Sequence, residues 1–168
     1  MHGYDFRKGQ EQRGSESTLP TEEPTGIAVI GVVAAGQWVE AMSDAAGRQR
    51  TPVAADPRYP RQHQYAFEVR GNAMDGFARN GDFLIVVNRG ASGLAPRPGD
   101  IVIVTRTKGD LREVTARRLE IVGAEPVLRY DSTDPRYADA SIRLNEVRSV
   151  GEKTSIDGIV VAVYRPLT

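Results

Sequence analysis

The chain has 168 residues, 40% of them hydrophobic and 26% charged, and its 22 basic side chains balance its 22 acidic ones. This length allows one domain with a hydrophobic core and a tail, and the zero net charge gives no overall electrostatic reason to bind nucleic acid. Because cysteine is absent and the two histidines, His2 and His63, lie far apart, disulfides and a structural zinc site are excluded, and we expect no cofactor.

The N-terminal part of the chain differs in composition from the rest. Residues 1–24 are polar and rich in Gly, Ser, Glu and Pro, so they bury too little apolar surface to fold, and we predict a flexible tail or interdomain linker. Residues 25–168 are predicted to form one folded domain. No apolar run approaches the roughly 20 residues that cross a membrane, and the N-terminus lacks the pattern of a signal peptide. We therefore expect a cytoplasmic protein with no membrane partner.

The predicted folded domain begins with a β-branched run, Ile27 to Val33, which is typical of a strand. Small residues follow, Ala34-Ala35-Gly36, and their simplest interpretation is a strand that ends at a glycine bulge. Turn signals such as Asn80-Gly81 separate later apolar runs, which predict strands at 65–70, 83–87, 101–105, 112–119, 127–130 and 156–164. Many short strands with Gly and Pro turns predict a mostly β fold. Short helices are expected only after Met74 and near 144–149.

Two further stretches carry candidate functional residues. Gly71-Asn72-Ala73-Met74 follows the predicted strand at 65–70. In the run from Glu113 to Leu119, strand alternation places Thr115, Arg117 and Leu119 on one face. An arginine between Thr and Leu would be half buried and would need an acidic or carbonyl partner. The alternative is that Arg117 and Arg118 are solvated charges on an edge strand, where they discourage aggregation.

The order of these motifs over about residues 27–165 resembles the C-terminal domain of LexA and phage CI repressors. That domain defines the S24 family of self-cleaving proteins, which also includes UmuD and is related to signal peptidases. The resemblance implies a LexA/UmuD/signal-peptidase-like β fold of short twisted strands with one or two short helices. In this family the third residue of a Gly-x-Ser-Met motif is the nucleophilic serine, and it cuts an Ala-Gly bond. Here the serine position is Ala73, and the matching bond is Ala35–Gly36. The residues that would flank the cleft are Gly71, Asn72, Met74 and Thr115.

The general base of the family is a lysine in a Val-Thr-x-Lys pattern, and Arg117 occupies that position. A desolvated lysine can lose its proton and then accept the serine proton, whereas arginine stays protonated at any useful pH. The resemblance therefore implies a chain in which both dyad positions are substituted and no catalytic residue is intact. An engineered Ser-to-Ala change would explain Ala73 alone, while the pair with Arg117 favours a natural pseudo-peptidase.

The resemblance also implies partners. Relatives form homodimers through their C-terminal region, here the apolar run at 156–165, and a repressor would reach DNA only through a helix-turn-helix domain absent from this chain. A RecA filament is a further partner that the family suggests. The leading interpretation is the dimerisation and regulatory domain of a LexA/CI-like transcriptional repressor, unable to cleave itself. Two alternatives stay open: a self-cleaving S24 serine peptidase captured as a Ser-to-Ala variant, and a UmuD-like protein-interaction module of the DNA-damage response.

Overall fold

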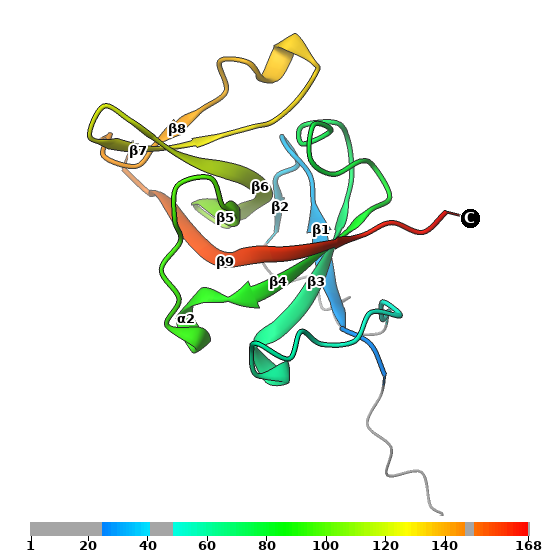
Figure 1. Ribbon diagram of the computed structural model, residues 1–168. Helices are drawn as coiled ribbons and strands as arrows, with labels where there is room; N and C mark the ends of the chain where they lie inside the picture. Colours follow the sequence, from blue (N-terminus) through cyan, green and yellow to red (C-terminus); the bar gives the residue numbers. More distant parts are fainter. Residues whose placement is uncertain (1–24, 41–48, 147–149, 168) are drawn as a thin grey trace, which may run out of the picture.

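The computed structural model describes residues 25–40, 49–146 and 150–167, and these residues are mostly β-strand (Figure 1). The strands are β1 (Val29–Val33), β2 (Val39–Glu40), β3 (Gln64–Val69), β4 (Phe83–Asn88), β5 (Ile101–Lys108), β6 (Leu111–Val122), β7 (Glu125–Arg129), β8 (Ile142–Arg143) and β9 (Glu152–Tyr164). The short helices in the described ranges are η1 (Arg61–His63), α2 (Arg89–Ser92) and η2 (Pro135–Tyr137). The prediction of a mostly β fold with few short helices is confirmed. Over the same ranges, no helix is long and apolar enough to cross a membrane.

The described strands form one sheet that curls back on itself. Its order is β1-β3-β4-β9-β5-β6-β7-β8, with β2 beside β6. The pair of β1 and β3 is parallel, and the other pairs are antiparallel. Just after β1, the Ala34 amide donates to the Val114 carbonyl of β6 at 3.0 Å. This single contact brings the β1 edge of the open sheet against β6, so β1, β3, β4, β9, β5 and β6 form a partly closed barrel, called the barrel below. Strands β7 and β8 extend from this barrel as an arm (Figure 1).

The barrel encloses the main hydrophobic core. The apolar runs Leu84–Val87 of β4 and Ile101–Val104 of β5 are at most 5% exposed at every position, so both faces of these strands are buried. Their inward side chains pack in one cluster with Val33 of β1, Phe67 and Val69 of β3, Ala116 of β6, and Met74 from the turn after β3. Smaller clusters cover the outer faces, one of them where Leu119 and Leu128 meet Val102. The barrel wall is therefore a rigid support for the loops at its ends.

Bulges bend the strands around the barrel. The register of β1 against β3 steps from Val29 to Gly31, which leaves Ile30 as an extra residue in β1. Strand β9 skips Asp157 in its pairing with β5 and Val161 in its pairing with β4. A bulge locally increases the twist and turns the side chain of the extra residue in a new direction. Two of these residues, Ile30 and Asp157, line the same cavity, which is described below.

The expected helices are not found at their expected places. After Met74 the chain makes hydrogen-bonded turns, with the amides of Phe77 and Ala78 both donating to the Met74 carbonyl at 2.9 and 2.6 Å. Residues 144–146 are also a turn, and 147–149 lie outside the described residues, as does the predicted tail at 1–24. The helix α2 instead begins after Asn88, whose side chain accepts from the Ala91 amide, and ends at Gly93. The two-residue strands β2 and β8 were not expected.

Candidate functional site

The Ala35–Gly36 bond lies in a tight turn directly after β1. The Gln37 amide donates to the Ala34 carbonyl at 3.4 Å, and Gly36 has a φ of +77°. A positive φ at the third residue of such a turn defines type II, and glycine adopts it without steric cost. The bond is therefore the central peptide of a β-turn. A substrate strand lying flat in a cleft would instead be extended at this point.

Strand β6 holds this turn from one side. The Gly36 amide donates to Glu113 Oε2 at 2.7 Å, and the carboxylate also pairs with Arg106 Nη1 at 3.3 Å. Only 3% of Glu113 is exposed, so these partners compensate a carboxylate that is almost fully removed from water. The carbonyl of Val114, the next residue of β6, accepts the hydrogen bond from the Ala34 amide, as described above. The turn is thus fixed at two consecutive positions of β6.

Ala73 lies beside the same turn. Ala35, Ala73, Met74 and Thr115 line one cleft of about 10 Å³, a space with room for about one water molecule. Ala73 and Met74 are 8% and 4% exposed, and the Met74 side chain belongs to the barrel core. The structure therefore brings together three sequence-predicted segments: the Ala-Gly bond, the motif around Ala73, and the Thr115 strand.

The other predicted flanking residues support the motif without lining this cleft. Gly71 has a φ of +82°, and its amide donates to Asn80 Oδ1 at 2.9 Å, so the turn at 71–74 is tied to the Asn80-Gly81 turn. Asn72 does not line the cleft and contacts the segment that follows β7. Gly36 lies on the far side of the turn, where it lines a neighbouring cavity together with Arg117.

Arg117 is 2% exposed and fully engaged with its surroundings. Its Nε donates to Thr115 Oγ1 at 3.1 Å, and its terminal nitrogens donate to the Ala140 carbonyl and the Tyr130 hydroxyl, both at 2.7 Å. The guanidinium carbon also lies 3.8 Å from the centre of the Tyr130 ring, a cation–π contact. The expectation of a carbonyl partner for Arg117 is confirmed. The interpretation of Arg117 as a solvated edge charge is wrong, because the arm and Tyr130 cover this part of β6.

Tyr130 connects the two sides of the site. It lines both the Ala73 cleft and a larger cavity of about 510 Å³ that contains the Arg117 side chain. Burial raises the pKa of the Tyr130 phenol, and the neighbouring Arg117 charge opposes this rise only in part. At neutral pH the phenol therefore stays protonated. The site presents a neutral hydroxyl and a fixed positive charge next to the Ala35–Gly36 turn.

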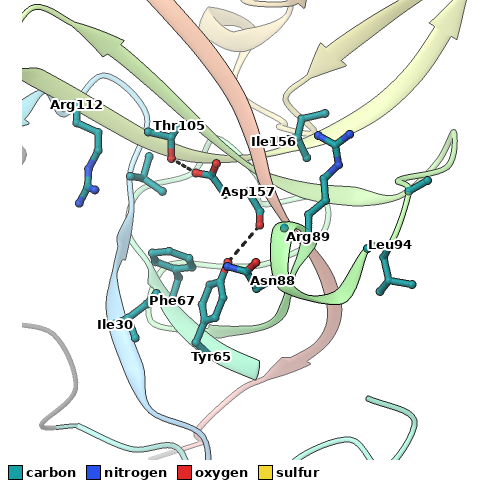
Figure 2. A pocket seen from close by; sticks show the side chains of 14 residues that line it. Ile30, Tyr65, Phe67, Asn88, Arg89, Leu94, Thr105, Arg112, Ile156 and Asp157 are labelled. Atoms are coloured by element: carbon teal, nitrogen blue, oxygen red, sulfur yellow. Dashed lines mark hydrogen bonds between the residues drawn. The ribbon is translucent and has the colours of Figure 1, made fainter. Parts of the chain in front are cut away.

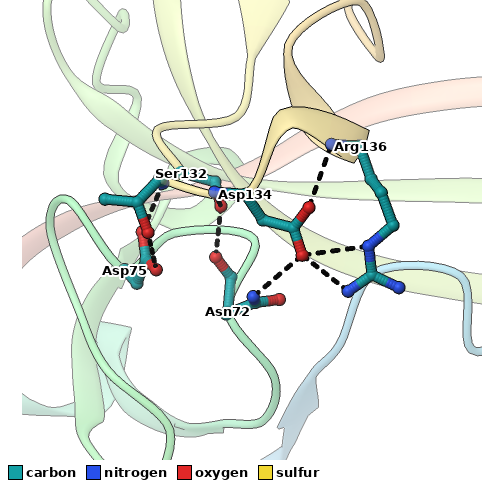
Figure 3. A network of polar contacts seen from close by, with 6 residues as sticks. Asn72, Asp75, Ser132, Asp134 and Arg136 are labelled. Atoms are coloured by element: carbon teal, nitrogen blue, oxygen red, sulfur yellow. Dashed lines mark hydrogen bonds and ion pairs between the residues drawn. The ribbon is translucent and has the colours of Figure 1, made fainter.

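A polar network ties Asn72 to the segment after β7 (Figure 3). Asn72 Nδ2 donates to Asp134 Oδ2 at 3.1 Å, and the Ser132 hydroxyl donates to the Asn72 carbonyl at 2.6 Å. Asp75 accepts from both the amide and the hydroxyl of Thr133, at 2.7 and 2.6 Å. Hydrogen bonds from Arg136 hold the pKa of Asp134 far below its usual range, and those from Thr133 lower the pKa of Asp75. We call these contacts the 72–134 latch.

The described residues that line the Ala73 cleft include no hydroxyl with a general base beside it. Thr115 supplies a hydroxyl to the cleft, but its neighbours are Arg117 and the protonated Tyr130, and neither accepts a proton at neutral pH. The described lysines, Lys108 and Lys153, line neither this cleft nor the Arg117 cavity. In the same ranges no cluster of three His, Asp or Glu side chains is placed to hold a metal ion.

Three contributors to the site were not identified in the sequence: Glu113, Tyr130 and Asp134. Glu113 acts on a residue 77 positions away, and Asp134 on one 62 positions away, so no local pattern reveals them. The available signal for Glu113 was its alternation with Thr115 and Arg117 along β6, which places all three on the buried face. Tyr130 had no comparable signal.

Comparison with known proteins places nearly all of the barrel in one family. The sequence model of the family described as Peptidase S24-like matches residues 28–160. This match spans every strand from β1 to most of β9, and it includes the Ala35–Gly36 turn, Ala73 and Arg117. A comparison with curated proteins finds no match.

Proposed function

Because the chain belongs to the Peptidase S24-like family, we propose that it is a regulatory domain of a LexA/CI-like repressor that does not cleave itself. The observation that supports this proposal is the composition of the Ala73 cleft and of the neighbouring Arg117 cavity. The Ala35–Gly36 turn lies against the methyl group of Ala73, the position that the resemblance assigns to the serine, and Arg117 stands at the position that the resemblance assigns to the lysine. A methyl group cannot attack a carbonyl, and a guanidinium cannot accept a proton.

In this proposal the turn that contains Ala35–Gly36 stays packed beside the Ala73 cleft and is a part of the fold. Glu113 and Val114 fix the turn in place, and the buried Arg117 joins β6 to Tyr130 and to the arm at Ala140. These contacts stabilise the cleft without any chemistry. The biological role is then association: a homodimer through the C-terminal region would hold two DNA-binding domains, supplied from outside this chain, on paired half-sites.

Self-cleavage at alkaline pH, with and without an activated RecA filament, tests the proposal. The chain as given, Ala73→Ser, and Ala73→Ser with Arg117→Lys are incubated and analysed by mass spectrometry for fragments that end at Ala35 and begin at Gly36. We expect no cleavage of the first two proteins, because Arg117 cannot activate a serine. The double variant is expected to cleave slowly as its lysine loses a proton at high pH.

A matched control places a hydroxyl elsewhere in the same cleft. Ala116 lines the cleft and is 3% exposed, so Ala116→Ser with Arg117→Lys has the same composition but no serine at position 73. This control should remain intact. Cleavage of Ala73→Ser alone would refute the proposal and support a self-cleaving enzyme captured as a Ser-to-Ala variant. Circular dichroism melting curves establish that each variant is folded.

A further inference from the structure

A separate cavity of about 740 Å³ opens at one mouth of the barrel (Figure 2). It is formed by β1, β3, the end of β4, α2 and the residues that follow α2, β5, β6 and β9. It shares no lining residue with the Ala73 cleft or the Arg117 cavity. Its volume lies within the range of about 300–1,000 Å³ that is typical of sites for small ligands, and barrel mouths are a common place for such sites. We call it the mouth cavity.

The lining of the mouth cavity is apolar and polar in about equal parts. Phe67, Val114 and Ile156 contribute apolar surface, and the Tyr65 and Phe67 rings pack edge to face with centres 5.6 Å apart. Burial raises the pKa of Tyr65 to about 12, with Asp157 adding to the rise, so the phenol is a hydrogen-bond donor at neutral pH. Figure 2 shows the Tyr65 hydroxyl directed toward the backbone of Asp157. Such a lining suits a ligand with an apolar body and one charged group.

The bulges described above shape this cavity. Ile30 is the extra residue of β1, and Asp157 is the extra residue of β9 in its pairing with β5. Both line the mouth cavity, on strands that lie apart in the sheet order. Bulges next to binding sites re-aim side chains that regular pairing would direct elsewhere. The cavity therefore depends on two specific irregularities of the barrel.

Among the residues that line the cavity, Arg112 carries a buried hydrogen-bond donor without a partner. Its Nε is buried and has no hydrogen-bond partner in the described part of the chain. The carboxylate of Asp157 is already engaged by the hydroxyls of Thr105 and Ser155. In the described residues neither Arg112 nor Arg89, the other cation of the lining, forms an ion pair. A buried N–H without an acceptor is unfavourable. Because the Nε has almost no accessible surface, a ligand in the cavity would pair with the terminal nitrogens of Arg112.

The charged side chains that line the cavity indicate the charge of the ligand. Two arginines and one aspartate leave a net charge of 2 − 1 = +1. A ligand with a single negative charge neutralises this, whereas a dianion would also face the Asp157 carboxylate. Figure 2 shows Arg89 and Arg112 on opposite sides of the cavity, so one small anion contacts one of them. Arg112 is favoured because its side chain is half-buried, whereas Arg89 is exposed.

We propose that the mouth cavity binds a small organic carboxylate, with its single negative charge on Arg112 and its apolar body against Phe67, Val114 and Ile156. The planar guanidinium matches a carboxylate with two parallel hydrogen bonds. The ligand would lie one residue along β6 from Glu113, which holds the Ala35–Gly36 turn. This site does not depend on whether the chain cleaves itself.

Titration of the full chain with 4-phenylbutyrate, followed by amide NMR shifts, tests the proposal. We expect saturable shifts around Thr105, Val114 and Ile156. The neutral isostere 4-phenylbutanamide should bind about tenfold or more weakly, since it lacks the charge that Arg112 pairs with. Arg112→Gln should weaken 4-phenylbutyrate binding by a similar factor. The matched variant Arg89→Gln should change it by no more than about twofold, as expected for an exposed charge at the rim.

Three outcomes would each refute the proposed binding site. The NMR shifts could fail to saturate, they could centre outside the mouth cavity, or the acid and the amide could bind equally well. Tighter binding of 3-phenylpropyl phosphate than of 4-phenylbutyrate would contradict the assignment of a single negative charge. The comparison of acid and amide uses the unaltered chain, so the result stands even if Arg112→Gln does not fold.

Discussion

Asp82 is a buried carboxylate whose partner comes from the end of the chain. It is 2% exposed, and Arg165 donates to its two oxygens at 2.9 and 2.7 Å. The hydrogen bonds from Arg165 are the largest cause of a pKa below the usual 3.8, and the Arg79 amide adds to the effect. A lowered folded-state pKa stabilises the fold above pH 3.8 or so, and this stabilisation is lost as the pH falls through the folded-state pKa.

Arg165→Gln should lower the free energy of unfolding at pH 7 by about 1–3 kcal/mol, because it leaves Asp82 buried without its charged partner. Urea denaturation measures the change. The control is Arg129→Gln, which breaks a pair with Glu120 in which both side chains are more than a third exposed, and it should cost less than about 1 kcal/mol. Equal effects of the two substitutions would show that the burial of Asp82 has no energetic consequence. The loss of stability between pH 4 and pH 2 should also be smaller in Arg165→Gln, since the pKa of Asp82 then lies closer to its unfolded value.

At the scale of elements, the 72–134 latch holds the turns at residues 71–77, called the motif loop here, against the segment after β7. Both carboxylates of the latch have lowered pKa values, so their contacts are present above pH 3.8 and are lost as the pH falls through their folded-state values. Asp75→Asn with Asp134→Asn should imitate this loss at neutral pH. We expect severalfold faster hydrogen exchange at the Gly76 amide, which donates to the Asp131 carbonyl at 3.0 Å.

The control for the latch is Asp56→Asn. Asp56 also has a pKa lowered by a neighbouring arginine, Arg58, but it lies in the loop before η1. Its substitution should leave the exchange of the Gly76 amide unchanged. If the latch variant exchanges Gly76 no faster than the parent chain, then backbone contacts alone hold the loop and the carboxylates are dispensable.

Strand β9 contains a position where only glycine fits. A Cβ at Gly158 would collide with Val86 Cγ1 and would lie 2.9 Å from the Tyr65 hydroxyl and 3.0 Å from the Val87 carbonyl oxygen. Gly158→Ala should therefore destabilise the barrel by about 1–3 kcal/mol through overpacking, measured by thermal or urea unfolding. Ala162→Ser, at an exposed position of the same strand, should have little effect. If Gly158→Ala leaves the free energy of unfolding unchanged, β9 can shift away from β4 without loss of stability.

The strands were predictable from sequence to a larger extent than the helices. Runs of β-branched residues, such as those of β4 and β5, indicated strands because their burial on both faces requires continuous apolar sequence. The two-residue strands β2 and β8 are too short to show any alternation. The signals for α2 and η2 were present, namely the Asn88 cap and Asp134 before Pro135, but they mark single turns that hydrophobic periodicity does not detect.

At the scale of the whole molecule, the proposed function requires two copies of the chain. If the C-terminal region forms a homodimer, light scattering should give twice the chain mass of 18.3 kDa. Ala162→Arg places a charge on the outer, exposed side of β9 and should shift the mass toward the monomer. Ala124→Arg, at the exposed β6–β7 turn, serves as the control and should remain dimeric. If light scattering gives the mass of a monomer at all concentrations, the proposed role in dimerisation is refuted.

The closure of the barrel could not be predicted from the sequence. It depends on the parallel pairing of β1 with β3 and on the contact of Ala34 with Val114, which join residues far apart in the chain. The proximity of Ala35 to Ala73 follows from this closure, and it was anticipated only through the family resemblance. The partners of Glu113 and Tyr130, which are Gly36 and Arg117, are brought to them by the same fold.

The turn after β1 also has an optical consequence. Trp38 is the single tryptophan of the chain, it lies two residues after Gly36, and the guanidinium carbon of Arg106 is 5.3 Å from its ring centre. A charge at this distance changes the energy of the excited indole, and Arg106 is held there by Glu113, the same carboxylate that binds the Gly36 amide. Intrinsic fluorescence therefore reports on the position of the turn without any added label. Displacement of the turn, by a partner or by substitution of Glu113, is expected to appear as a shift in the emission of one residue.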